Sequence, residues 1–460
     1  MRRACTTCSR HFDVAHQDAL AAVQCPACEA DGYNRRGIYL SKQGDYQRAV
    51  AEFDQALRLV PAHAQASNNR GYARAALRLY DRAVADFDHA IKLDPRFAAA
   101  YNNRGLVHMA REAYAEAIAD FTAALDFDPA IALAWMNRGF ARSAQGLFQE
   151  ALADLDQAIQ LSGKLANAFH NRGFVHTALG DFDRALADYD AEILLKGDRP
   201  YAYYNRGFVY TILGNFERAL ADFDCAIRLK PNFAAGHFWR GDLYRARGET
   251  EHAVTNYSAA LMHNPAFLVA YFHRGDALHL MGRHAEAAED FSATIRLDPK
   301  NPAAFSNRGQ ARAAQGEFVL AIADFDEALR LNPKYLHAYH GRGLAYAAQN
   351  DHDRAVIDHI EAIRLCPHSA EAYNNFARFW ASCPDRGRRD ATMAIELAQQ
   401  ACEISARQDW SCLTTLAAAH AENGDFAEAI RWSERALELA PPLQKHAVRE
   451  TLQDLRGRLS

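Results

Sequence analysis

Residues 98–131 read AAAYNNRGLVHMAREAYAEAIADFTAALDFDPAI, and this stretch decides the fold. Its first part, from Ala99 to Ala110, and its second part, from Tyr114 onward, each place apolar residues three or four positions apart, which is the spacing of one helix face. A turn separates the two parts, and Pro129 prevents the second helix from continuing. The stretch therefore predicts two antiparallel helices, with apolar residues Tyr101, Leu106, Met109, Tyr114, Ala117, Phe121, Ala124 and Leu125.

The same pattern recurs along the chain with a period of 34 residues. Glycine returns without a slip at Gly37, Gly71, Gly105, Gly139, Gly173, Gly207, Gly241, Gly275, Gly309 and Gly343. We number this glycine position 8 of its repeat, so that the alanine found twelve residues later, from Ala49 to Ala355, is position 20. A fixed period of this length indicates a solenoid of stacked units, each burying its apolar face against the next.

These positions resemble the tetratricopeptide repeat, which also has small residues at positions 8, 20 and 27, aromatic residues at 17 and 24, and proline at 32. The resemblance extends from residue 30 to about residue 441 and gives twelve units. It implies an all-α fold, a right-handed superhelical solenoid over residues 30–442. The eleventh unit, at about 370–408, resembles a long-turn variant found near the ends of bacterial repeat arrays, with Ala377 in place of the glycine. Residues 443–460 are expected to form a helix that caps the last apolar face.

Two CxxC pairs precede the repeats. Sixteen residues separate the pairs, a spacing typical of a zinc site with two knuckles. Four thiolates complete a tetrahedral zinc ion and leave no position for water, so the predicted metal is structural. Residues 1–29 thus resemble a small zinc ribbon, in which Phe12, Val14 and Val23 indicate two short strands. The alternatives are two chance CxxC pairs or a redox dithiol. The ribbon has two open roles, as a cap of the first repeat or as a module that binds a partner or nucleic acid. The predicted ligands are Cys5, Cys8, Cys25 and Cys28.

The family resemblance places position 6 of each first helix in a concave groove. Asparagine recurs there, and its amide both donates and accepts, so a row of amides can bind the backbone of an extended peptide. An equal alternative is that these amides bond to a neighbouring repeat. At position 5, Tyr204, Phe238 and Phe272 are expected to be exposed aromatic anchors. The asparagines are Asn69, Asn103, Asn137, Asn171, Asn205, Asn307 and Asn375.

Matched charges also follow the period. An arginine at position 7 precedes each of the ten glycines. An acidic residue stands sixteen positions after many of these arginines, which predicts pairs inside the repeats. At position 9, Asp242 and Asp276 replace the apolar residue of units one to six, so the groove is expected to become acidic there. The acidic partners are Asp86, Asp120, Asp154, Asp188, Asp222 and Asp324.

The composition and the absence of certain motifs exclude several classes of function. The chain has a formal charge of -5, so it has no general attraction to nucleic acid or anionic membranes. Its first residues lack the apolar core expected of a signal peptide, and no run of 18 apolar residues follows, so a cytoplasmic location is expected. No enzyme motif stands outside the period, so we expect neither catalysis nor a small-molecule substrate.

Two function classes follow from these exclusions. The expected function is a scaffold or adaptor that binds an extended or helical peptide segment of partner proteins. The alternative is a regulator whose zinc ribbon contacts nucleic acid while the repeats recruit proteins. The basic residues near the ribbon are few, namely Arg2, Arg3, Arg10, Arg35 and Arg36.

Overall fold

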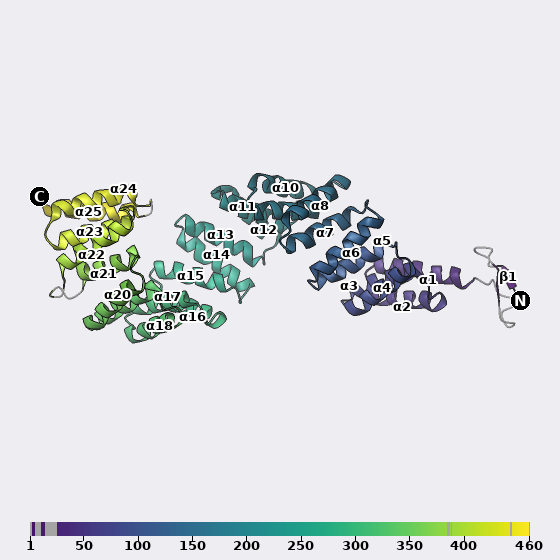
Figure 1. Cartoon of the computed structure of the whole chain (residues 1–460), viewed down its shortest axis with the longest axis horizontal. Coiled ribbons are helices and arrows are strands. Elements are labelled where there is room, and N and C mark those ends of the chain that lie inside the picture. Colours follow the sequence, from purple (N-terminus) through teal and green to yellow (C-terminus); the bar gives the residue numbers. More distant parts are fainter. Residues whose placement is uncertain are drawn as a thin grey trace. The chain divides into compact units, whose positions relative to one another are not determined.

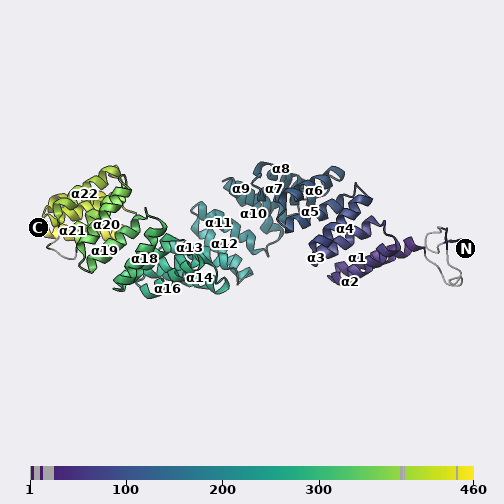
Figure 2. The same cartoon turned by 60° about the horizontal axis from the view of Figure 1, so that its bottom comes forward.

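The computed structural model describes residues 2–4, 11–13, 25–383, 387, 389–441 and 444–459. In these residues the chain forms two short strands and 25 helices. The chain divides into two compact units, Met1–Leu229 and Lys230–Ser460, which we call the N-unit and the C-unit. Figures 1 and 2 show, from two directions, that each unit is built of successive helix pairs.

The N-unit begins with two strands and continues with six helix pairs. Odd-numbered helices are the first helices of the repeats, and even-numbered helices are the second. The elements are β1 (Arg2–Ala4), β2 (His11–Asp13), α1 (Pro26–Lys42), α2 (Tyr46–Leu59), α3 (Ala64–Ala76), α4 (Tyr80–Leu93), α5 (Ala98–Ala110), α6 (Tyr114–Phe127), α7 (Ala132–Ala144), α8 (Phe148–Leu161), α9 (Ala166–Ala178), α10 (Phe182–Leu195), α11 (Pro200–Ile212) and α12 (Phe216–Leu229).

The C-unit continues the same alternation and adds one last helix. Its elements are α13 (Ala234–Ala246), α14 (Thr250–His263), α15 (Leu268–Leu280), α16 (His284–Leu297), α17 (Pro302–Ala314), α18 (Phe318–Leu331), α19 (Leu336–Ala348), α20 (His352–Leu365), α21 (Ala370–Ser382), α22 (Ala391–Ile404), α23 (Trp410–Glu422), α24 (Phe426–Leu439) and α25 (Lys445–Leu459). The helix pairs predicted for the repeats are therefore confirmed, and the stretch 98–131 forms α5 and α6. None of the described helices is long and apolar enough to cross a membrane.

Close contact between the two helices of a repeat explains the glycine at position 8. A Cβ atom added to Gly105 would lie 2.8 Å from Cε1 of Phe121, the aromatic residue at position 24. The alanines at positions 20 and 27, Ala117 and Ala124, are fully buried. Small residues at these three positions let the helices approach until the aromatic ring fills the space between them.

The turn inside each repeat explains the second glycine of the pattern. At position 15, Gly146 has a φ of +77°, and Glu112 occupies the same position of its repeat with a φ of +58°. Left-handed backbone is open to glycine without steric cost and strained for most other residues. The turn therefore keeps one geometry in the first ten repeats and in the twelfth, with or without glycine.

The end of the chain departs from the period. Residues 383–390 separate α21 from α22, whereas three residues separate α19 from α20. The last helix, α25, packs against α24 and buries Val448, Leu452 and Leu455. These three side chains cover apolar surface that a further repeat would otherwise cover.

The two strands differ in part from the expectation. Arg3 of β1 pairs with Phe12 of β2 in an antiparallel ribbon. A strand at Phe12 was expected, but its partner precedes Cys5 instead of lying between the cysteine pairs. Val14 and Val23 lie outside the described residues.

Candidate functional site

A row of apolar residues stands at position 9 of the first helices in the N-unit. Its members follow the glycine of each repeat and recur every 34 residues. Four of them, Tyr72, Leu106, Phe140 and Phe174, are between 39% and 52% exposed. An apolar series that stays in contact with solvent is a typical feature of a binding surface. We call the following six residues the position-9 row: Ile38, Tyr72, Leu106, Phe140, Phe174 and Phe208.

Two pockets open along this row. The first, of about 230 Å³, is lined by Ile38, Ser41, Lys42, Phe53, Asn69 and Tyr72. The second, of about 250 Å³, is lined by Tyr72, Ala75, Ala76, Tyr80, Phe87, Asn103, Leu106, Val107 and Ala110. Each pocket is bordered by position 9 of two successive repeats and by the position-6 asparagine of the second. The same backbone geometry therefore presents mostly apolar pockets one repeat apart.

Two of the predicted groove asparagines bond to the preceding repeat. Nδ2 of Asn69 donates to Oδ1 of Asn34 at 3.0 Å, and Nδ2 of Asn103 donates to Oδ1 of Asn68 at 2.9 Å. Both pairs join the first helices of neighbouring repeats. At these two positions the geometry matches the alternative in which the amides link repeats.

The other asparagines have different surroundings. Among the described residues the structure gives no side-chain partner for Asn137, Asn171 or Asn205, which are half-buried. Nδ2 of Asn307 donates to Oδ1 of Asp276 at 2.8 Å, and Oδ1 of Asn375 accepts from Arg378 at 3.3 Å. The seven amides therefore do not form one uniform ladder.

At position 9 the residues of the C-unit differ from those of the N-unit. They are Asp242, Asp276, Gln310, Leu344, Arg378 and, in the twelfth repeat, Ala418. The Asp242 carboxylate accepts hydrogen bonds from His273, Arg245 and Tyr257. Burial raises the pKa of Asp242, but the bonds from His273 and Arg245 outweigh it and bring the pKa to about 2. For Asp276, burial is the largest effect and raises the pKa. The expected acidic surface is thus partly neutralised by cationic neighbours.

The three aromatic candidates at position 5 differ in exposure. Phe238 is only 5% exposed, so the expectation that it lies at the surface is wrong. Its ring lies 5.0 Å from that of Phe267 and 5.7 Å from that of Tyr257, which enclose it in the core. Tyr204 and Phe272 are half-buried and rest against the position-24 rings of their own repeats.

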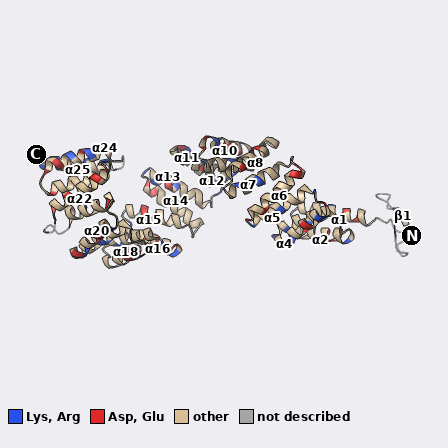
Figure 3. Cartoon of the chain, viewed as in Figure 1, with Lys and Arg blue, Asp and Glu red and all other residues tan. Residues whose placement is uncertain are grey.

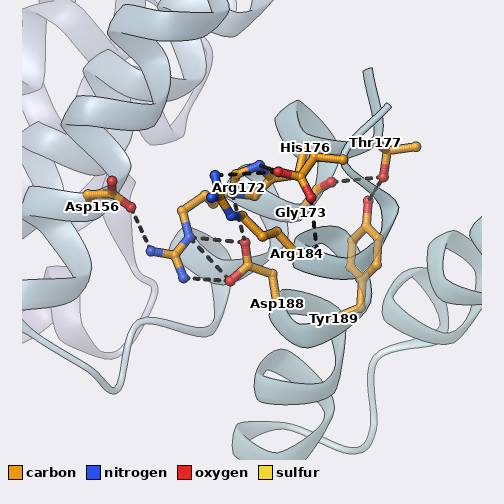
Figure 4. A network of polar contacts seen from close by, with 9 residues as sticks. Asp156, Arg172, Gly173, His176, Thr177, Arg184, Asp188 and Tyr189 are labelled. Carbon is orange, nitrogen blue, oxygen red and sulfur yellow. Dashed lines mark hydrogen bonds and ion pairs between the residues drawn. The ribbon is translucent and has the colours of Figure 1, made fainter. Parts of the chain in front are cut away.

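The arginines at position 7 are internal, as predicted. Arg172 donates to Asp188 of its own repeat at 2.6 Å and to Asp156 of the preceding repeat at 2.6 Å (Figure 4). The hydrogen bond to Asp188 outweighs burial and raises the pKa of Arg172. Figure 3 shows acidic and basic residues on the same helices in both units. Ion pairs to all six predicted carboxylates are present, from Arg70, Arg104, Arg138, Arg172, Arg206 and Arg308.

The predicted zinc ligands are described in part. Cys25 is buried and caps α1, and its Sγ accepts from the backbone N–H of Cys28 at 3.4 Å. Cys5 and Cys8 lie outside the described residues. In the part of the chain that the structure describes, no three His, Cys, Asp or Glu side chains lie close enough to hold a metal ion. A helix N-terminus favours negative charge, so the position of Cys25 and Cys28 fits a pair of thiolate ligands.

The position-9 row is visible in the sequence, but the period alone does not show that these residues are exposed. An apolar residue follows the glycine in six successive repeats, but the same regularity is expected of a core position. Arg378 gave no signal, because it stands in the repeat that has lost the glycine.

The stacked helix pairs and the exposed row on the first helices define a helical-repeat protein of the kind that presents a binding surface. Family models described as "Tetratricopeptide repeat" match residues 34–95, 73–131, 200–233, 306–370 and 411–440, and one described as "TPR repeat" matches residues 241–282 and 275–316. Together these matches span more than half of the chain. The chain belongs to the tetratricopeptide repeat family.

Solved structures of the same architecture are similar to the chain over different lengths. Yeast Tom70 is 15% identical, with a TM-score of 0.45, over 94% of this chain and 96% of that chain. A tetratricopeptide repeat protein from Parabacteroides merdae is 23% identical, with a TM-score of 0.40, over 54% and 98%. YrrB, described as having an unusual peptide-binding site, is 27% identical, with a TM-score of 0.35, over 40% and 95%. A comparison with curated proteins gave no match.

Proposed function

We propose that this protein is a non-enzymatic scaffold or adaptor that binds a peptide segment of partner proteins on the first helices of its N-unit. The observation that carries the proposal is the position-9 row with its two pockets, because these apolar side chains remain exposed although the helices around them are fully packed. Burying them against a partner gains about 25 cal/mol for each Å² of apolar surface removed from water. The row therefore offers both the driving force and the repeat spacing of a peptide site.

The two kinds of asparagine then have different roles in this site. Asn69 and Asn103 each donate a hydrogen bond to an amide of the preceding repeat, which stabilises the stack. Their side chains also line the two pockets. Asn137, Asn171 and Asn205 are the amides that we propose bind the peptide backbone. A peptide seated in this way gains specificity from apolar side chains that enter the pockets and affinity from its main chain.

A displayed library of short randomised peptides, selected on the full-length protein, tests the proposal. Tyr72→Glu and Leu106→Glu each place a charge at the border of a pocket, and we expect peptides selected by the wild type to bind at least about tenfold more weakly to each variant. Leu194→Glu is the matched control, because Leu194 is 88% exposed and lies on α10, a second helix. Selected peptides that bind all three variants as tightly as the wild type would place the site elsewhere.

The amides have a separate test on the same peptides. Changing Asn137, Asn171 and Asn205 together to alanine is expected to weaken binding without altering which side chains are selected, because backbone bonds do not depend on peptide sequence. The matched control is Asn68→Ala, which removes the acceptor of the Asn103 amide without lining either pocket and is expected to lower stability and to leave affinity nearly unchanged. Equal affinity for the triple variant would show that the row acts without the amides.

We also propose that Cys5, Cys8, Cys25 and Cys28 hold one structural zinc ion. The support is the presentation of Cys25 and Cys28 by the first turn of α1, with a backbone N–H directed at the Cys25 sulfur. Reduced thiols of this kind suit a reducing compartment, so we propose a cytoplasmic location. Bound zinc measured by mass spectrometry of the native protein is expected to be one ion for the wild type and none for Cys25→Ser. A wild-type protein without metal and with unchanged stability would overturn the site.

A further inference from the structure

Arg378 stands apart from the arginines that build the repeats. It is an exposed residue of α21 and the only basic residue at position 9 in the C-unit. Its Nη2 atom donates to Nε2 of His340 at 2.6 Å and to Oδ1 of Asn375 at 3.3 Å. Both partners are neutral, whereas Arg342, one repeat earlier, pairs with Asp358 and Asp326. Among the described residues, no carboxylate lies within ion-pair distance of Arg378.

The surroundings leave this guanidinium charged and its partner neutral. Burial lowers the pKa of Arg378, yet a guanidinium keeps its proton at neutral pH. Burial, followed by the charge of Arg378, lowers the pKa of His340 to about 3. A neutral imidazole that accepts at Nε2 carries its proton on Nδ1. His340 therefore acts as a neutral support that fixes the guanidinium and does not compete with it for an anion.

His340 and Arg378 both have nitrogen atoms for which the described residues provide no hydrogen-bond partner. Nδ1 of His340 is buried and has no partner within the described structure. The two bonds of Arg378 use one of its three nitrogens, although a guanidinium carries five N–H donors. Because Arg378 is exposed, its remaining N–H groups are accessible from solvent, where a fixed positive charge attracts an anion as acceptor.

The size of the positive charge indicates which anion fits. A carboxylate carries one negative charge and matches a guanidinium through two parallel hydrogen bonds. A phosphate carries nearly two charges, and Glu371, whose charge acts on Arg378, would repel it more strongly. Glu371 itself is paired with His337 at 3.1 Å. Leu344, the preceding residue of the series, is exposed on α19, which contacts α21, and offers an apolar neighbour.

We propose that Arg378, held in place by His340 and Asn375, binds the carboxylate of an aspartate or glutamate side chain in a partner peptide. This inference rests on the proposed peptide-binding function and adds a second point of recognition in the C-unit. The site selects an acidic residue, and Leu344 favours an apolar residue next to it. Asn375, one of the predicted groove asparagines, contributes by orienting the arginine.

The experiment selects a displayed library of short randomised peptides, whose C-termini are blocked by fusion, on the full-length protein. The variants are Arg378→Gln and the control Arg364→Gln, which removes the same charge from an exposed arginine paired with Glu361 on α20. We expect Asp or Glu to be enriched several-fold at one peptide position by the wild type and by Arg364→Gln, and not by Arg378→Gln. Replacing that residue by its amide should weaken binding to the wild type about tenfold and leave binding to Arg378→Gln unchanged.

Different contrary results would overturn the carboxylate site, the proposed peptide-binding function, or both. Equal enrichment of acidic residues by Arg378→Gln would overturn this inference and leave the peptide function standing. So would a wild-type selection in which every enriched peptide lacks an acidic residue and loses binding in Tyr72→Glu. A library in which the wild type enriches no peptide would overturn both. Tighter binding of a phosphoserine peptide than of its glutamate counterpart would overturn the choice of carboxylate, as would equal binding of peptides whose only carboxylate is a free C-terminus.

Discussion

Two glycines of α1 allow the packing of a repeat to be tested within one helix. A Cβ atom added to Gly37 would lie 2.5 Å from Cε1 of Phe53, whereas one added to Gly32 has only the end of Arg36 nearby, at 3.9 Å. Alanine in a helix is about 1 kcal/mol more favourable than glycine, and both substitutions gain this amount. Overpacking adds a cost of about 1–3 kcal/mol at Gly37 alone. Gly32→Ala is therefore expected to stabilise α1 by about 1 kcal/mol, and Gly37→Ala to destabilise it by up to about 2 kcal/mol.

Hydrogen exchange of the α1 and α2 amides in the full-length protein is the suitable assay. Repeat arrays open locally, so a single unfolding midpoint would average the effect over all repeats. The difference between the two variants isolates the overpacking cost, because the gain in helix propensity is common to both. Equal protection of α1 and α2 in Gly37→Ala and Gly32→Ala would refute the claim that position 8 is glycine because of the ring at position 24.

Two further predictions concern buried charge and buried histidine. Arg138→Met is expected to destabilise its repeat by about 3 kcal/mol, because Arg138 and Asp154 form a buried pair at 2.7 Å. Arg330→Met, at an exposed pair, should cost much less. Urea unfolding followed by hydrogen exchange measures both, and equal costs would contradict the reasoning. His359→Phe restores the aromatic residue found at position 24 of most repeats. Burial lowers the pKa of His359 to about 3, below its unfolded value near 6.5, so the stability that neutral His359 allows is lost as the pH falls between these values. We expect the variant to be more stable than the wild type and to show a flatter dependence of stability on pH from 6.5 to 4; an unchanged dependence would mean that other groups control it.

The features that follow the period could be predicted from the sequence. Each helix pair, the contact of Gly105 with Phe121, and the pairing of Arg172 with Asp188 depend on interactions that every repeat makes in the same way. Ten copies of one pattern supply the information that a single copy lacks, because chance similarities do not recur at a fixed spacing. For the same reason the long turn before α22 was visible as an interruption.

The surroundings of single residues could not be predicted in this way. Phe238 is buried because Phe267 and Tyr257 happen to be large enough to enclose it, and position 5 in other repeats has different neighbours. Asn69 bonds to Asn34 because position 5 of the preceding repeat is also an amide. Both outcomes depend on pairs of residues from different helices, and a period reports only what recurs at one position.

This contrast indicates where selectivity is encoded. Positions 7, 8, 20, 24 and 27 are nearly constant because each is tied to a partner inside the stack, so a change there costs stability before it changes binding. Position 9 has no partner that recurs from repeat to repeat, so its residue can vary. It is apolar from Ile38 to Phe208, acidic at Asp242 and Asp276, and basic at Arg378. The change from apolar to charged falls between the last repeat of the N-unit and the first of the C-unit, so each unit presents its own chemistry. Substitutions at position 9 should consequently alter which peptides are bound while leaving the fold intact.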